Sequence, residues 1–334
     1  MSPFDYSRGK PDFIVEMEKA NPKWSRSSVT FVTADPAAHN ESRIVKGEYY
    51  RPTQARKVPL AIIVHGLGDQ TVFPCKMLAR SLVNSGIACL VLHTVFHSTR
   101  MPEAMKKRAP IFTCDEWFEG HRTSVIEVRQ GIDWAESRPE INPEQIAVIG
   151  VSLGGFIASM AMGVDARLKA GAFITMGGDA MMLGYEGKVD IFRKGYVCGE
   201  EECRRIHAEY PEYLAQVTEK GLGNVIPSKQ CFLNDTLTFG PSLKGRPVLM
   251  INALWDKYIP RKAALRFWEK CARPAIIWLP AGHVTIWGLY PVISRNVVRF
   301  IRSAFSLQGR RSWSLPRIRD VIHRKHSTAS WRPV

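Results

Sequence analysis

The chain has 334 residues, of which 45% are hydrophobic and 23% are charged, so it can bury a large core and is not a largely disordered protein. Its net charge is +15, of which residues 307–334, rich in arginine and with Asp320 as the single acidic residue, supply +6, and the rest is spread thinly. Nucleic-acid binding by the main body is therefore not implied, and we predict no nucleic-acid partner.

The N-terminal residues and the cysteines indicate in which cellular compartment the protein is expected. The first residues lack a basic segment followed by an apolar run, and no uncharged apolar stretch reaches the roughly 18 residues that span a bilayer. The seven cysteines are scattered, which indicates reduced thiols rather than a disulfide framework. Cys198 and Cys203 form the one close pair, and without a second pair we predict loop thiols and no metal. We expect a soluble, cytoplasmic protein.

Short apolar runs alternate with helical patterns along most of the chain. The predicted helices are a short one around Phe13–Lys19, residues 74–85, Asp115–Ser137, Gly155–Met162, Arg261–Cys271 and Val292–Phe305. The predicted strands are Ser28–Thr33, Ile44–Tyr50, Val58–Val64, Ile87–Leu92, Gln145–Gly150, Ala170–Met176, Pro247–Asn252 and Ala275–Leu279. Strands that alternate with helices predict an α/β fold with a mostly parallel sheet and helices on both faces.

Two segments break this rhythm. Residues 178–246 interrupt the core, predicted as 1–177 and 247–306, and a connection this long is typical of a cap or lid over a site. Residues 307–334 carry apolar side chains at helical spacing beside basic ones. This pattern fits an amphipathic helix that contacts an anionic membrane peripherally, and it fits two other interpretations equally. A solvated tail and a helix packed on the body are the alternatives.

The strongest motif is Gly150-Val151-Ser152-Leu153-Gly154-Gly155, which lies between an apolar strand and a helix of small residues. A serine on such a sharp turn is exposed as a nucleophile, and glycines two residues away on each side remove collisions with neighbouring backbone. The helix N-terminus that follows favours developing negative charge. We therefore predict Ser152 as a catalytic nucleophile, with an ordinary serine in a glycine-rich turn as the alternative interpretation.

A second glycine-rich loop, His65-Gly66-Leu67-Gly68-Asp69, follows strand Val58–Val64. Its glycines allow the backbone to curl so that N–H groups face an oxyanion. We predict that the amides of Leu67 and Leu153 are the oxyanion donors. His65 is predicted to orient this loop rather than to act as a base.

Chain order selects the remaining catalytic groups. A serine needs a base, and in this architecture the acid and then the histidine follow the nucleophile along the chain. His283 comes directly after strand Ala275–Leu279, and Asp256 follows strand Pro247–Asn252. We predict Asp256 as the acid that orients His283. Asp179, which follows the preceding strand, is the alternative acid.

These motifs together resemble the α/β-hydrolase superfamily, in particular its dienelactone-hydrolase-like and prolyl-oligopeptidase-like esterases. The resemblance covers about residues 45–305 and rests on the His65-Gly66 loop, the Ser152 turn, the Asp256 segment and His283. It implies the α/β-hydrolase fold with an eight-stranded sheet, and hydrolysis of an ester, amide or thioester without a cofactor. The partner expected is a small-molecule acyl substrate.

The segment after strand Ile87–Leu92 is expected at the rim of the pocket. Some hydrolases that resemble this chain carry a similar His-x-x-Arg segment there, so His97 and Arg100 are predicted to bind a substrate anion. A salt bridge from Arg100 to the acidic cluster at 113–120 is the alternative.

For the whole chain we expect a serine hydrolase that cleaves a carboxylic ester. An acyltransferase with the same triad and a non-catalytic binding protein of the same fold are the alternatives.

Overall fold

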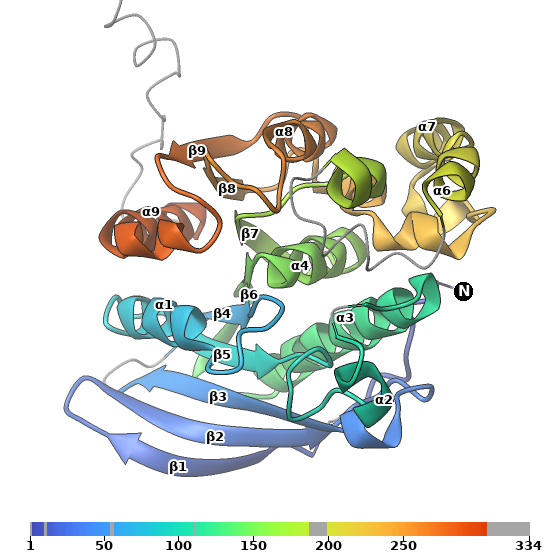
Figure 1. Cartoon of the computed structure of the whole chain (residues 1–334). Helices are drawn as coiled ribbons and strands as arrows, with labels where there is room; N and C mark the ends of the chain where they lie inside the picture. The colour runs from blue at the N-terminus through green and yellow to red at the C-terminus, as the bar shows by residue number, and fades with distance from the viewer. Residues whose placement is uncertain (1, 10–11, 54–56, 110, 187–198, 306–334) are drawn as a thin grey trace, which may run out of the picture.

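The computed structural model describes residues 2–9, 12–53, 57–109, 111–186 and 199–305. Its strands form one sheet of nine strands in the order β1-β2-β3-β5-β4-β6-β7-β8-β9 (Figure 1). The strands are β1 (Ile14–Ala20), β2 (Trp24–Val32), β3 (Ile44–Pro52), β4 (Val58–Val64), β5 (Ala88–His93), β6 (Ile141–Val151), β7 (Leu168–Ile174), β8 (Val248–Ala253) and β9 (Ala275–Leu279). The strands from β5 across to β9 pair in parallel, whereas β1, β2 and β3 are antiparallel additions at one edge. The mostly parallel sheet is therefore confirmed.

The N-terminal edge of the sheet corrects two expectations. Residues Phe13–Lys19, predicted as a short helix, form strand β1 and pair with β2, so the sheet has nine strands rather than eight. Most of β1 is exposed, so local pattern alone could not distinguish it from a surface helix. The ring of Phe13 stacks on Phe31 of β2 with centroids 4.0 Å apart, and this long-range contact favours the strand.

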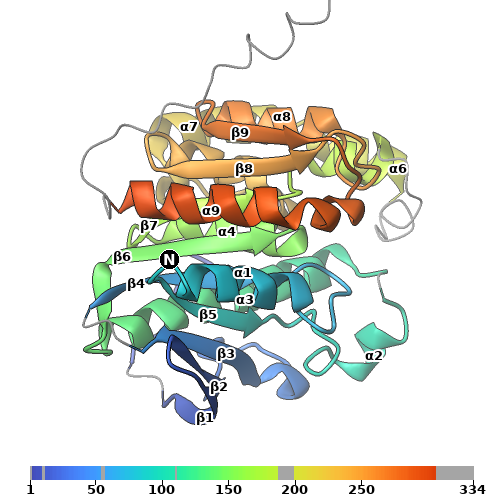
Figure 2. The same cartoon turned by 90° about the vertical axis from the view of Figure 1, so that its left-hand side faces the viewer.

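The sheet is buried on both faces, as a continuous apolar strand requires. In β4, Leu60, Ile62 and Val64 join one hydrophobic cluster, whereas Ala61 and Ile63 join the cluster on the opposite face. Helices α1 (Phe73–Val83) and α9 (Tyr290–Ala304) cover the second face and lie in front of the sheet in Figure 2. Helices α3 (Cys114–Glu136), α4 (Leu153–Val164) and α8 (Arg261–Lys270) contribute to the first.

The predicted cap segment packs into the main core. Within it, α6 (Glu200–His207) and α7 (Tyr210–Lys220) are followed by several short 3-10 turns. Tyr210, Phe232 and Phe239 belong to the same hydrophobic cluster as α3 and α4. The segment is thus continuous with the α/β core, and its role as a cap stays a prediction. The predicted basic tail lies outside the described residues.

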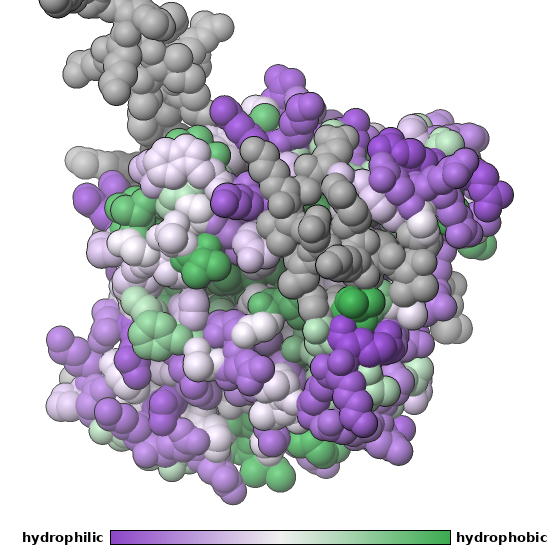
Figure 3. All heavy atoms as spheres, in the orientation of Figure 1, coloured by the Kyte–Doolittle hydropathy of each residue, from purple (hydrophilic) through white to green (hydrophobic). Residues whose placement is uncertain are grey.

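The remaining connections are short. The segment predicted as a loop between β5 and α3 contains one helical turn, α2 (Glu103–Lys106). Within the part of the chain that the structure describes, no helix combines the length and apolar character needed to cross a membrane. On the face seen in Figure 3, hydrophobic residues occur in the middle and also at the lower edge, between hydrophilic residues that cover much of the remaining surface.

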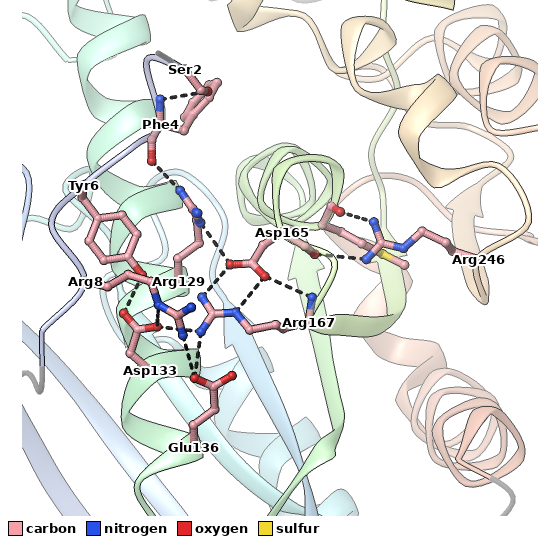
Figure 4. A network of polar contacts seen from close by, with 11 residues as sticks. Ser2, Phe4, Tyr6, Arg8, Arg129, Asp133, Glu136, Asp165, Arg167 and Arg246 are labelled. Carbon is pink, nitrogen blue, oxygen red and sulfur yellow. Dashed lines mark hydrogen bonds and ion pairs between the residues drawn. The ribbon is translucent and has the colours of Figure 1, made fainter. Parts of the chain in front are cut away.

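A polar network holds the N-terminal residues against α3 (Figure 4). The Tyr6 hydroxyl donates to Asp133 at 2.6 Å, and Arg8 pairs with Glu136 at 2.8 Å. Arg167, just before β7, also contacts both of these carboxylates. Burial and the neighbouring Asp133 carboxylate raise the pKa of Tyr6, so its hydroxyl remains a donor. The residues before β1 are therefore held against the C-terminal end of α3.

We predict that Phe4→Ala destabilises the fold much more than Phe73→Ala. Phe4 is 1% exposed and lies edge-on to Phe239, with ring centroids 5.7 Å apart, whereas Phe73 on α1 is 56% exposed. Loss of a buried phenyl ring leaves a cavity and costs about 3–5 kcal/mol of unfolding free energy. The exposed site should change by no more than about 0.5 kcal/mol. Urea unfolding of both variants measures this, and equal effects would contradict the core role of Phe4.

Candidate active site

Ser152 occupies the turn from β6 into α4 in a left-handed conformation, with φ 51° and ψ −119°. This conformation is strained for a residue with a side chain, and such strain gathers at functional sites. A Cβ at Gly150 would lie 2.1 Å from the carbonyl oxygen of Gly154. A Cβ at Gly154 would lie 2.1 Å from the carbonyl oxygen of Val64 in β4. Only glycine fits at both positions, and α4 consequently starts directly against the sheet.

Three side chains form a hydrogen-bonded chain that ends at this serine. Ser152 Oγ lies 2.9 Å from His283 Nε2, and His283 Nδ1 lies 2.7 Å from Asp256 Oδ2. A carboxylate only accepts, so Nδ1 carries the proton and Nε2 presents its lone pair to the serine hydroxyl. The structure thus brings together the serine, histidine and first-choice acid that the sequence singled out.

The loops after β8 and β9 hold the histidine and the acid in register. The N–H groups of Leu254 and Trp255 donate to the carbonyls of Leu279 and Ala281, both at 2.9 Å. The other carboxylate oxygen of Asp256 accepts the N–H groups of Tyr258 at 2.8 Å and Ile259 at 2.9 Å. The carboxylate is therefore fixed on both oxygens, so it can set the orientation of the His283 ring.

Asp179, the alternative acid, has different partners. Its carboxylate forms an ion pair with Arg266 of α8 and accepts the N–H of Met182 at 3.1 Å. Its N–H donates to Asp235 at 2.9 Å. These contacts hold the start of the 178–246 segment, and the hydrogen bond to His283 comes from Asp256 instead. The choice of Asp179 as the acid is therefore not supported by the geometry.

The glycine-rich loop after β4 lies beside the serine. A Cβ at Gly66 would meet the Cβ of Ser152 at 3.3 Å, which shows how closely the loop approaches the turn. His65 is fully buried, with Nδ1 2.8 Å from the carbonyl oxygen of Gly66 and Nε2 accepting the N–H of Thr94 at 3.1 Å. Burial lowers the pKa of His65 to about 4, so it holds this loop as a neutral ring.

Ser152 opens into a small cavity of about 80 Å³. Leu67 and Leu153, the predicted oxyanion donors, both line it, and Leu153 is the first residue of α4, where N–H groups lack a partner within the helix. Most of the wall is apolar, with side chains from α3, α4, the 178–246 segment and the loop before α8. The other lining residues are Trp117, His121, Phe156, Ala180, Leu183, Asn234, Asp235 and Ile259.

Sequence reasoning missed most of this wall. It did not single out His121, which follows Trp117 by four residues on the predicted helix Asp115–Ser137 and so lies on the same face. No sequence motif precedes Asn234 and Asp235, so nothing in the sequence indicated that they line a cavity. Asp235 is buried, and its carboxylate accepts the N–H groups of Asp179, Ala180 and Leu237. Burial raises its pKa to about 6, and its hydrogen bonds tie the 178–246 segment together beside the cavity.

The expectation that Arg100 and His97 bind a substrate anion is wrong for Arg100. Its side chain is fully buried and pairs with both carboxylate oxygens of Glu127 on α3, at 2.6 and 2.8 Å. The alternative salt bridge to residues 113–120 is wrong as well. His97 is also buried, and its Nε2 lies 2.9 Å from the carbonyl oxygen of Gln70. Neither residue lines the cavity at Ser152, because Arg100 pairs with Glu127 and His97 with the carbonyl of Gln70.

Comparison with known proteins bears on this fold and site. The family model described as "alpha/beta hydrolase domain containing 18" matches residues 27–174. An acetyl xylan esterase from Paenibacillus sp. R4 superposes with a TM-score of 0.63 at 18% identity, covering 88% of this chain and 89% of the esterase. Acetyl xylan esterase 1 from Thermoanaerobacterium sp. JW/SL YS485 gives a TM-score of 0.61 at 13% identity, covering 87% and 88%.

This chain has the α/β-hydrolase fold. The resemblance inferred from the sequence motifs is thereby confirmed at the level of fold. An uncharacterized protein of Mycobacterium tuberculosis (strain H37Rv) is 25% identical over 191 residues, which are 57% of this chain but 39% of that protein. The chain thus spans about two fifths of the length of this curated relative.

The predicted absence of a metal concerns Cys198 and Cys203. Cys198 lies outside the described residues, and Cys203 is buried in α6. Among the residues that the structure describes, no group of three or more His, Cys, Asp and Glu side chains is arranged to hold a metal ion.

We predict that Gly154→Ala destabilises the protein whereas Gly223→Ala does not. A Cβ at Gly154 would also lie 2.7 Å from the carbonyl oxygen of His65, so the start of α4 must move away from β4. Overpacking of this kind costs about 1–3 kcal/mol. A Cβ at Gly223 meets nothing within 4 Å. Urea unfolding compares the two, and a Gly154 variant as stable as the wild type would refute the close contact.

Proposed function

We propose that this α/β hydrolase is a serine hydrolase that cleaves carboxylic esters through an acyl-enzyme. The observation that supports this most directly is the hydrogen-bonded chain from Ser152 Oγ through His283 to Asp256, with lengths of 2.9 and 2.7 Å. Its order and geometry are those of a nucleophile, a base and an orienting acid. The neighbours of like fold that are named acetyl xylan esterases support ester cleavage as the reaction class.

The proposed mechanism follows from the protonation states. His283 Nε2 takes the proton of Ser152 Oγ as the oxygen attacks the acyl carbonyl, and Asp256 stabilises the imidazolium that forms. The tetrahedral intermediate collapses when His283 returns that proton to the leaving alcohol. Water then repeats the two steps on the acyl-enzyme, which releases the acid and restores the serine.

The oxyanion is proposed to lie between the amides of Leu67 and Leu153. Leu153 begins α4, so its N–H and the positive end of the helix dipole both favour negative charge beside Ser152. Leu67 follows Gly66, where an added Cβ would lie 3.3 Å from the Cβ of Ser152, and His65 holds the carbonyl of Gly66. Each such donor contributes roughly 10²–10³ to the rate in enzymes of this kind.

The first test concerns the nucleophile. A fluorophosphonate probe should label the purified protein, and Ser152→Ala should abolish the labelling and lower p-nitrophenyl ester hydrolysis by roughly 10³-fold or more, because no other group attacks the carbonyl. Ser228→Ala is the matched control, since this serine is exposed and far along the chain from the turn. Labelling that survives in Ser152→Ala would reject the proposal.

The second test separates the two candidate acids. Asp256→Asn should lower kcat by about 10³–10⁴-fold, because an amide at this position no longer stabilises the imidazolium or selects the Nδ1–H tautomer. Asp179→Asn should lower kcat far less, since its carboxylate pairs with Arg266. Steady-state hydrolysis of a p-nitrophenyl ester gives both values. The reverse order of the two losses would assign the acid to Asp179.

A further inference from the structure

Two histidines hold the glycine-rich loop after β4, and the proposed mechanism uses neither of them. His65 Nδ1 lies 2.8 Å from the carbonyl oxygen of Gly66, and His97 Nε2 lies 2.9 Å from the carbonyl oxygen of Gln70. Within the described part of the chain, His97 is the only side chain from another element that hydrogen-bonds to residues 66–70. The loop is therefore anchored at both ends.

The anchor on Gly66 bears directly on the proposed oxyanion donor. The Gly66 carbonyl and the Leu67 N–H belong to one planar peptide unit and point in opposite directions. A hydrogen bond that holds this carbonyl consequently sets the direction of the N–H. The Asp69 N–H also donates to the Gly66 oxygen, at 3.3 Å. Among the described residues, the Leu67 N–H donates to no group, so it is available to an oxyanion.

The middle of the loop cannot fix its own shape. Gly68 lies there with φ 75°, and a Cβ added to it would meet nothing within 4 Å. Glycine has more backbone freedom than any other residue, so packing at this point does not select one conformation. The bond from His97 holds Gln70 in place, and with it the adjacent Asp69, whose N–H reaches back to the Gly66 oxygen.

The contacts of His97 determine which of its nitrogens donates. The Thr99 N–H donates to His97 Nδ1 at 3.3 Å, so the ring proton is on Nε2 and points at the Gln70 carbonyl. Burial lowers the pKa of His97, which keeps the ring neutral at pH 7. The ring also stacks on His93, with centroids 4.4 Å apart. His97 is thus a fixed, neutral donor.

Arg100 supports the turn that presents this histidine. The His97 N–H donates to the Thr94 carbonyl at 3.0 Å, and the Arg100 N–H donates to the His97 carbonyl at 2.8 Å. The buried Arg100 guanidinium pairs with Glu127 on α3 and donates to the carbonyl of His93 at 2.6 Å. Both ends of the turn are therefore tied to the core, and the spacing of the histidine and the arginine has a structural explanation.

We propose that His97 is a positioning residue for the oxyanion hole, because its bond to Gln70 keeps the loop in the shape that aims the Leu67 N–H. Arg100, held by Glu127, supports it from behind. This inference rests on the proposed function, since an oxyanion forms only if the serine attacks a carbonyl. It differs from the anion-binding role predicted from the sequence, because neither side chain lines the cavity.

The experiment compares two amide variants. His97→Gln carries its amide N–H groups about as far from the backbone as Nε2, whereas His97→Asn is one methylene shorter and does not reach the Gln70 carbonyl. Hydrolysis of p-nitrophenyl acetate gives kcat and KM, with active molecules counted by fluorophosphonate labelling taken to completion. We expect His97→Asn to lower kcat about 10- to 100-fold with KM within about threefold, because an oxyanion donor acts on the transition state. His97→Gln should stay within about fivefold of the wild-type kcat.

A transition-state analogue gives a second measurement. When a trifluoromethyl ketone binds, Ser152 Oγ adds to its carbonyl, the serine proton passes to His283, and the carbonyl oxygen becomes an oxyanion. The inhibition constant in His97→Asn should weaken by about the same factor as kcat/KM, because both report binding of the transition state. In His97→Gln it should stay near the wild-type value.

His207→Asn is the matched control. It makes the same substitution at a half-buried histidine of α6, whose Nδ1 lies 3.3 Å from the carbonyl oxygen of Cys203. His207 does not line the cavity at Ser152. Its substitution should leave kcat per labelled molecule and the inhibition constant as in the wild type.

Three results would overturn this inference while the serine-esterase proposal stands. One is a wild-type kcat per labelled molecule in His97→Asn, even with a lower melting temperature, because the histidine then serves stability alone. The second is a raised KM with unchanged kcat, which places His97 in substrate binding. The third is an equal loss of kcat in both amide variants, which removes the role of the Nε2–H donor. Failure of the probe to label wild-type Ser152 is a separate outcome that rejects the proposed function itself.

Discussion

The close approach of α4 to the sheet at Ser152 is the constraint on which the site depends. The turn between β6 and α4 has room for no Cβ at Gly150 or Gly154, and it holds Ser152 at a positive φ. Strain of this kind persists only where the surrounding structure overdetermines it. Strand β6 lies between β4 and β7 in the interior of the sheet. Both faces of the sheet are covered by hydrophobic clusters, and this packing holds the turn after β6 in its strained conformation.

The same arrangement explains why residues far apart in sequence meet at one edge. Parallel strands all point their carboxyl ends the same way, so the loops after β4, β6, β8 and β9 gather beside one another. Backbone hydrogen bonds from Leu254 and Trp255 then join two of these loops directly. The sheet thus sets the backbone positions of Asp256 and His283. Their side chains then form the hydrogen bonds that link Asp256 through His283 to Ser152.

Much of this edge could be predicted from the sequence, because its signals are local. Strands β4 and β9 have the predicted bounds, and the order of Ser152, Asp256 and His283 follows from which strand each residue succeeds. The errors arise where distant contacts decide. Strand β1 exists because it pairs with β2, and Arg100 is buried because Glu127 lies on a helix that packs behind it. No local pattern contains either fact, nor the contribution of Asn234 and Asp235 to the cavity wall.

Two buried polar residues of that wall differ in how fully their polar atoms are paired. Asp235 lines the cavity, but its carboxylate already accepts three backbone N–H groups, so it anchors the neighbouring segment. His121 lines the same cavity with one nitrogen bound to Asn234, and its other nitrogen is buried without a partner in the described residues. Desolvation of such a nitrogen destabilises the free protein unless something pairs with it.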